Sequence, residues 1–235
     1  MKNLTIAVVA TLSLSACVTI NAPMDGTSNN TAIQYPVESA LLNIYTQNRT
    51  STLMTMLGNQ QISADITVAP KGAVVFDNKR VQSAQIRTIS KIDDKVTNQT
   101  TSTNYYTLNP LTFHGYTDRS GEYSIATQTA TIPKMATAIA DKSYPLLTEN
   151  VYSDSSKSQK TAVYRQSWSL TPDSSNSAWL CINTSENLLL ATPVGSTSEC
   201  YKINTKGQIL SSKVSINVPN NNANNSTSTI TLVSQ

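Results

Sequence analysis

The sequence predicts a mainly β protein, an antiparallel meander of about 11–12 strands that forms an open or half-closed barrel and carries one short N-terminal helix. Short segments with apolar side chains at every second position recur along the chain, and two-residue turn signals such as Gly58-Asn59 separate them. The composition agrees, because the 235 residues include 30 serines, 32 threonines and 22 asparagines, and only 13% are charged. Threonine favours strands, whereas serine and asparagine favour turns.

The first predicted element is a helix over residues 36–47. Its proline suits the first helical turn, and Val37, Leu41 and Ile44 recur at spacings of three and four residues, as they would on one face of a helix. We expect this short apolar face to plug a sheet rather than to bind a partner.

After residue 50 the apolar period changes from that of a helix to two, which is typical of half-buried strands. The clearest case is Ile62, Ala64, Ile66 and Val68, which share one face. The predicted strands cover residues 50–57, 60–68, 73–76, 81–92, 95–108, 111–117, 122–132, 146–152, 161–170, 178–183, 199–204 and 208–218.

Turn residues separate these strands. The expected turns and breaks lie at residues 58–59, 70–72, 77–78, 93–94, 109–110, 118–121, 153–159, 172–177 and 206–207. Glycine, proline, asparagine and aspartate suit such positions, and Gly121 supplies a positive φ. Residues 133–145 are the least regular stretch and predict one helical turn or a loop.

The pattern divides the chain into four segments. These are a signal peptide over residues 1–16, a lipidated tether over 17–35, a β domain over 36–218, and a tail rich in Asn, Ser and Thr over 219–235. The tether lacks any apolar period, and the tail can add one edge strand near residues 229–233.

The first 17 residues have the order of a bacterial export signal. Lys2 supplies a positive charge, and the apolar run that follows is too short to span a bilayer. The run ends in Leu14-Ser15-Ala16-Cys17, which resembles the lipobox of bacterial lipoproteins. The resemblance implies that the Cys17 thiol receives a diacylglycerol, that the chain is cut before Cys17, and that the new amine is acylated. The alternative is an ordinary secretory signal with a chance cysteine.

Anchoring by acyl chains would place the protein in the cell envelope. The net charge is +3 and the lysines and arginines are scattered, so charge alone would not hold a membrane and the chain has no nucleic-acid footprint. Val18 follows the cysteine. In enterobacterial sorting an aspartate at that position retains a lipoprotein at the inner membrane, so its absence favours the outer membrane.

Cys181 and Cys200 are the cysteines that remain once Cys17 is assigned to lipid. In an oxidising compartment they predict a disulfide, and its closed loop of about 20 residues would stabilise the fold by roughly 3 kcal/mol on the chain-entropy model. A metal site is the rival interpretation, but one histidine and no close Cys-x-x-Cys spacing leave it without partners.

From Thr103 onward, several short motifs occur in a characteristic order. They are Tyr105-Tyr106-Thr107-Leu108-Asn109-Pro110, Pro145-Leu146, Tyr152, Asp154, Trp179-Leu180-Cys181-Ile182-Asn183 and Ser198-Glu199-Cys200-Tyr201-Lys202-Ile203. This order, over about half of the chain, resembles a set of uncharacterised bacterial envelope lipoproteins. The resemblance supports the Cys181–Cys200 pair and implies fold and location, but no activity.

No motif in the sequence indicates catalysis, a metal or a cofactor. The one histidine, His114, has no Gly-x-Ser-x-Gly nucleophile motif to work with. The acid pairs Asp93/Asp94 and Asp118/Glu122 fall at predicted hairpin ends, where acids cap turns. We therefore expect that the protein is not an enzyme.

A few apolar side chains are candidates for a binding surface. Trp168 and Trp179 lie on adjacent predicted strands, and Met54, Met56 and Met135 are soft apolar groups. Each set can line a concave carbohydrate or lipid site, but packing in the core is the more common role.

Two functions are consistent with these observations. The first is a lipid-anchored, non-enzymatic lipoprotein that binds an apolar ligand or lipid inside a curved sheet. The alternative is a structural or protein-interaction lipoprotein of the envelope with no small-molecule site. A sheet interior filled by the protein's own side chains would exclude the first.

Overall fold

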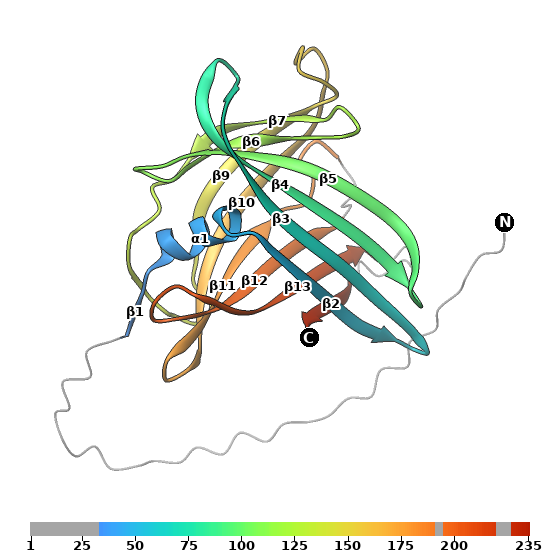
Figure 1. Cartoon of the computed structure of the whole chain (residues 1–235), viewed down its shortest axis with the longest axis vertical. Coiled ribbons are helices and arrows are strands. Elements are labelled where there is room, and N and C mark those ends of the chain that lie inside the picture. The colour runs from blue at the N-terminus through green and yellow to red at the C-terminus, as the bar shows by residue number, and fades with distance from the viewer. Residues whose placement is uncertain (1–32, 191–194, 220–226) are drawn as a thin grey trace. The chain divides into compact units, whose positions relative to one another are not determined.

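The computed structural model describes residues 33–190, 195–219 and 227–235, and these ranges contain one α-helix and fourteen strands (Figure 1). The elements are β1 (Gln34–Tyr35), α1 (Val37–Thr46), β2 (Arg49–Leu57), β3 (Gln60–Phe76), β4 (Lys79–Ile92), β5 (Lys95–Thr107), β6 (Thr112–Asp118), β7 (Tyr123–Thr129), β8 (Ala136–Thr137), β9 (Ser143–Tyr152), β10 (Lys160–Ser174), β11 (Ser177–Thr184), β12 (Ser196–Asn204), β13 (Ile209–Pro219) and β14 (Thr227–Ser234). The predicted signal peptide and Cys17 lie outside the described residues.

Twelve of the described strands form a closed antiparallel barrel, and they follow one another around its wall in chain order. The predicted mainly β meander with one N-terminal helix is confirmed. The sheet closes completely, however, instead of staying open or half-closed, because β14 pairs with β2. The sequence pattern carries no signal for this closure, since it joins residues such as Leu53 and Ser234 that are far apart in the chain.

Two joints in the barrel wall are narrow. A single residue pair, Thr117 with Tyr123, joins β6 to β7. Two pairs, Val233 with Met54 and Ser234 with Leu53, join β14 to β2. The other neighbouring strands share longer ladders, so these two joints have the fewest paired residues in the ring.

The helix α1 lies across one end of the barrel (Figure 1) and puts its apolar face into the interior. Two hydrogen bonds hold it there: the Leu111 backbone N–H donates to Glu38 Oε1 at 3.2 Å, and Asn43 Nδ2 donates to the Gly207 carbonyl at 3.1 Å. Gly207 has a φ of +75°, and a Cβ at that position would lie only 2.9 Å from Pro36 Cγ. The turn between β12 and β13 therefore needs glycine to reach the helix.

A solid apolar core fills the helix end of the barrel. Fully buried side chains from α1 meet others from the wall, among them Leu41, Ile44, Leu170, Leu180 and Ile203. Each such side chain stabilises the fold by about 1.5–3 kcal/mol through burial.

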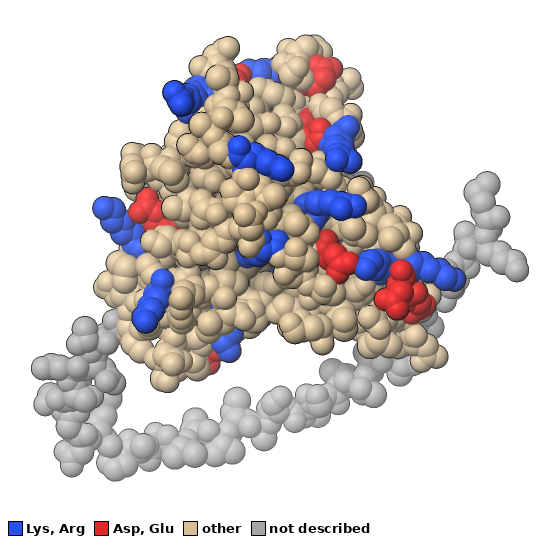
Figure 2. All heavy atoms as spheres, in the orientation of Figure 1, with Lys and Arg blue, Asp and Glu red and all other residues tan. Residues whose placement is uncertain are grey.

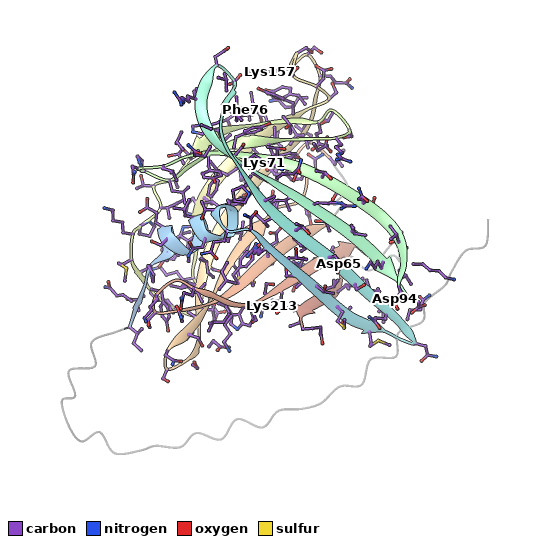
Figure 3. All side chains as sticks on the ribbon, viewed as in Figure 1. Asp65, Lys71, Phe76, Asp94, Lys157 and Lys213 are labelled. Atoms are coloured by element: carbon purple, nitrogen blue, oxygen red, sulfur yellow. A yellow bond between two sulfur atoms is a disulfide. The ribbon has the colours of Figure 1, made fainter. Side chains whose placement is uncertain are left out.

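The predicted turn at residues 70–72 proved wrong. The chain instead continues as one long strand, β3, and the register with β4 shifts between Pro70 and Gly72. Such a shift is a β-bulge, which bends a strand without ending it. Beyond it, Phe76 stacks on Tyr105 with ring centres 4.0 Å apart, and Lys157 pairs with Asp77 near the same hairpin tip (Figure 3).

Both predicted domain boundaries need correction. The tether was expected to reach residue 35, but Gln34–Tyr35 forms β1 against β8, and Tyr35 is buried in the core. The same pairing gives the irregular stretch at 133–145 a short strand rather than a helical turn. At the other end, β14 pairs with both β13 and β2, so it belongs to the barrel and is not an edge strand.

Charged side chains are sparse and mixed in sign on the visible face of the molecule (Figure 2). Three ion pairs occur among the described residues, and each joins a lysine to an aspartate: Lys91 to Asp65, Lys157 to Asp77, and Lys202 to Asp173. No helix in the described ranges has the length and apolar character needed to cross a membrane.

Candidate functional site

The barrel encloses a cavity of about 520 Å³, here called the lumen, which lies beyond the end filled by α1. Tyr45, in the last turn of α1, lines its inner end and packs edge-on against Phe113 at 5.3 Å. Side chains from every described barrel strand except β7 form the rest of the lining. The volume falls within the range of about 300–1,000 Å³ that is typical of small-molecule sites.

One side of the lumen is apolar. Ile66 on β3, Ile86 on β4, Ile216 on β13 and Leu232 on β14 all face inward. Strand alternation places them there, because inward positions recur at every second residue. Ile216 is still 37% exposed to water, so its side chain borders open space and not packed protein.

A polar group of three residues lies on the same part of the wall: Arg49 is on β2, between β14 and β3, and Glu199 and Tyr201 are on β12, next to β13. The Arg49 guanidinium carbon lies 5.0 Å from the centre of the Tyr201 ring, and the Tyr201 hydroxyl donates to Glu199 Oε2 at 3.3 Å. Burial raises the pKa of the Glu199 carboxyl, although the Tyr201 hydrogen bond and the charge of Arg49 oppose the rise. Burial also raises the pKa of Tyr201. The barrel wall surrounds Glu199 on all sides, but its side chain faces the open lumen and is therefore exposed to water there.

A second carboxyl, Glu149 on β9, is buried in the wall of the lumen with only 4% of its surface exposed. Ser124 Oγ donates to its Oε2 at 2.6 Å, and Gln166 Nε2 donates to its Oε1 at 3.1 Å. Burial raises the pKa of Glu149, and the hydrogen bonds from Ser124 and Gln166 oppose that rise. Both oxygens of this carboxyl are therefore already occupied by the protein.

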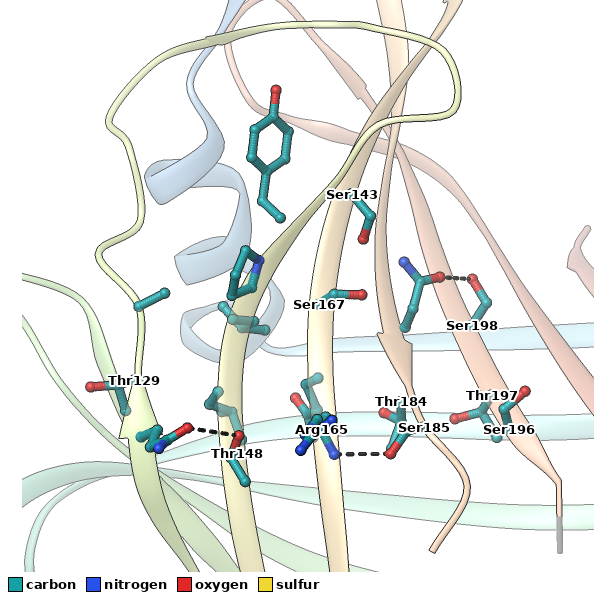
Figure 4. Close-up of a pocket in the computed structure, with 18 of the residues that line it drawn as sticks. Thr129, Ser143, Thr148, Arg165, Ser167, Thr184, Ser185, Ser196, Thr197 and Ser198 are labelled. Carbon is teal, nitrogen blue, oxygen red and sulfur yellow. Dashed lines mark hydrogen bonds between the residues drawn. The ribbon is translucent and has the colours of Figure 1, made fainter. Parts of the chain in front are cut away.

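A groove on the outside of the barrel has a different character. It measures about 810 Å³ and runs over β9 to β12, where hydroxyl and amide side chains predominate (Figure 4). Ser167 belongs to it because its neighbour Trp168 points into the core, so Ser167 faces outward. Ser198 donates to Asn183 at 2.7 Å on the groove floor, and Arg165 is the groove's one basic side chain.

The disulfide predicted between Cys181 and Cys200 is confirmed, with the two residues directly opposite each other on β11 and β12. The lipidation site Cys17 lies outside the described residues. His114 accepts or donates a hydrogen bond with Thr107 Oγ1 at 3.1 Å, and burial lowers its pKa. No described cluster of three or more His, Cys, Asp or Glu residues has the geometry to hold a metal ion.

The candidate aromatic and methionine surfaces do not form, and Trp168 takes the more common role of core packing. Trp168 packs in the core and stacks on Tyr144 at 4.5 Å, whereas Trp179 faces outward and donates to Asp173 at 2.9 Å. The two tryptophans therefore occupy opposite faces of the wall. Met56 and Met135 are exposed, so they belong neither to the core nor to the lumen lining.

Sequence reasoning missed Arg49, Glu149 and Glu199 as lumen residues. A usable signal was present, because each occupies an inward position of its strand: Glu199 is in phase with Tyr201 and Ile203, and Arg49 is in phase with Leu53. A charged residue in phase with the apolar positions of its own strand points into the interior.

No protein-family model matches the sequence, no curated protein matches it, and no solved structure matches the fold. Function is therefore inferred from the sequence motifs and the geometry of the lumen.

Proposed function

We propose that this protein is a lipid-anchored, non-enzymatic lipoprotein of the cell envelope that binds an apolar ligand, a lipid or a molecule of similar character, in the lumen. The observation that carries the proposal is the unfilled interior of the barrel. A fold built for stability alone would fill this space, because protein interiors are close-packed and voids reduce stability.

The lining supports an apolar ligand. The inward isoleucines of β3, β4 and β13 offer a surface that loses contact with water when a hydrocarbon replaces the solvent. That transfer is favourable by roughly 25 cal/mol for each Å² of apolar surface removed from water.

Binding can be tested with an apolar naphthylamine dye whose fluorescence rises in a dry environment. Ala64 lines the lumen, so Ala64→Trp should fill it and weaken dye binding at least roughly tenfold, a difference of about 1.4 kcal/mol. Thr67→Trp adds the same bulk to an exposed position on the same strand and should leave binding unchanged. Equal dye binding by both variants would refute a site in the lumen.

The anchor is supported by the Leu14-Ser15-Ala16-Cys17 motif. Cells grown with labelled palmitate should yield a labelled protein whose mass begins at an acylated Cys17, in the outer-membrane fraction. Cys17→Ser is the control and should be unlabelled. An unlabelled, uncleaved native chain would refute the anchor while leaving the lumen proposal standing.

The alternative is a structural or protein-interaction lipoprotein, and the outer groove favours it. Its lining of hydroxyls and amides offers hydrogen bonds with little charge. Crosslinking in cells separates the two: a partner lost on Ser167→Trp but retained on Ala64→Trp would support the groove. A partner retained by both variants, or none at all, would count against it.

A further inference from the structure

The proposed lumen contains a cation for which the protein supplies no counter-ion. Arg49 Nε is buried without a hydrogen-bond acceptor, and no carboxylate among the described residues forms an ion pair with the guanidinium. The Arg49 side chain as a whole is half-buried, and taking a charge partly out of water is unfavourable when no counter-ion compensates for it.

The two nearby carboxyls do not meet this need. Glu149 accepts hydrogen bonds from Ser124 and Gln166, and Glu199 accepts one from Tyr201. Neither carboxyl forms an ion pair with Arg49. Arg49 is therefore a positive group of the lumen wall that no described carboxylate pairs with.

The remaining space suits one hydrocarbon chain. The apolar side begins beside Arg49 with Ile86 and extends past Ile66 and Leu53 towards Ile62, close to the turn between β2 and β3. The volume of about 520 Å³ lies in the middle of the range of small-molecule sites, about 300–1,000 Å³, which suits an amphiphile with one hydrocarbon chain.

We propose that the ligand is a single-chain anionic amphiphile, with its acidic head group at Arg49 and its hydrocarbon chain along the apolar side formed by β3, β4, β13 and β14. This inference rests on the proposed function and names the class of its ligand. The guanidinium supplies a charge-assisted, two-pronged donor for a carboxylate or phosphate.

The test compares three molecules with the same chain and different head groups: dodecanoate, dodecanol and dodecyltrimethylammonium. The affinity of each is measured by its displacement of the naphthylamine dye from the full chain. The chain carries Cys17→Ser, so that no acyl chain of the protein itself competes. Dodecanoate should bind at least roughly tenfold more tightly than dodecanol, and the ammonium compound should bind most weakly.

Two substitutions connect that preference to Arg49. Arg49→Met should weaken dodecanoate binding roughly 10- to 100-fold and leave dodecanol binding unchanged, whereas Arg49→Lys should keep most of the preference. Arg165→Met removes a cation from the outer groove instead and should change neither. If Arg49→Met does not fold, the head-group series and Arg49→Lys decide the question.

The outcomes separate the two proposals. If the dye does not bind, or binds equally to the Ala64→Trp variant, the lumen proposal itself fails. If the dye binds in the lumen but dodecanoate and dodecanol bind equally, or Arg49→Met weakens both alike, only the anionic ligand is refuted.

Discussion

The two ends of the barrel interior use similar residues for different purposes. At the helix end, Leu41 and Leu180 are completely buried, and side chains from α1 fill the space between the walls. At the other end, isoleucines such as Ile66 and Ile216 border a cavity and remain partly exposed to water. Stability is therefore concentrated in the filled end, which leaves the hollow end free to serve a ligand.

The largest effect should come from a cavity made in the filled end. Leu180→Ala removes a fully buried side chain and should lower the free energy of unfolding by about 2–5 kcal/mol. Urea denaturation followed by tryptophan fluorescence measures this loss. A loss below about 1 kcal/mol would show that the filled end is not the main source of stability.

Removal of the disulfide should have the next largest effect. The double substitution Cys181→Ser and Cys200→Ser opens a link between neighbouring strands and should lower the free energy of unfolding by about 3 kcal/mol. Because the bridge constrains the unfolded chain, dye binding to the folded protein should be unchanged. A matching loss of dye affinity would mean that the bridge also shapes the lumen.

A smaller effect should appear as a change in pH dependence. Burial raises the pKa of Glu149 above its ordinary value of 4.5, so the folded state keeps this proton to a higher pH than the unfolded state does. Stability should therefore fall as pH rises from 4.5 through the raised pKa. Glu149→Gln should flatten this fall when the free energy of unfolding is measured against pH.

Asp94→Asn is the matched control for that measurement, because Asp94 lies exposed in the turn between β4 and β5. Its pH profile should follow that of the native chain. Glu199 also has a raised pKa, so some pH dependence should remain in Glu149→Gln. A profile unchanged from the native one would contradict the role given to burial of Glu149.

The smallest effect on stability should come from the hollow end. Ile216→Ala shortens a side chain that already borders water, so the free energy of unfolding should fall by about 1 kcal/mol or less. Dye affinity should fall more clearly, because a lumen surface is lost. If Ile216→Ala were as destabilising as Leu180→Ala, the contrast between the two ends would disappear.

Local signals in the sequence were sufficient for most of the fold. The helix predicted at residues 36–47 is observed as Val37–Thr46, and the tight turns at 77–78 and 93–94 are present with positive φ at all four residues. These features depend on a few neighbouring residues, which is why alternation and turn chemistry identify them.

The features that were missed depend on distant residues. Closure of the ring joins Leu53 to Ser234, and the strand β1 exists only because residues 136–137 come back to pair with it. At Pro70 the sequence signals a turn, but the chain continues as a strand because β3 pairs with β4 on both sides of the bulge. In each case the deciding contact lies outside any local window of sequence.

The candidate site was only partly predictable, for the same reason. The disulfide was predicted correctly because Cys181 and Cys200 are the two cysteines that remain once Cys17 is assigned to lipid. Arg49 and Glu199 could have been recognised as inward-facing from their phase along the strand, but their meeting with Tyr201 depends on the wall bringing β2 and β12 around the same cavity. Trp168 and Trp179 do not share a face because Trp168 pairs with Ile182 and Trp179 pairs with Thr171, and the sequence does not state this register.

The narrow joint between β14 and β2 also sets the order of assembly. About 180 residues separate Leu53 from Ser234, so this contact has a high loop-closure cost and should form late in folding. Until then, β2 offers unpaired backbone groups that another chain can join. The yield of refolding should therefore fall steeply as protein concentration rises. The folded protein, in which the ring is closed, should associate with other chains much less.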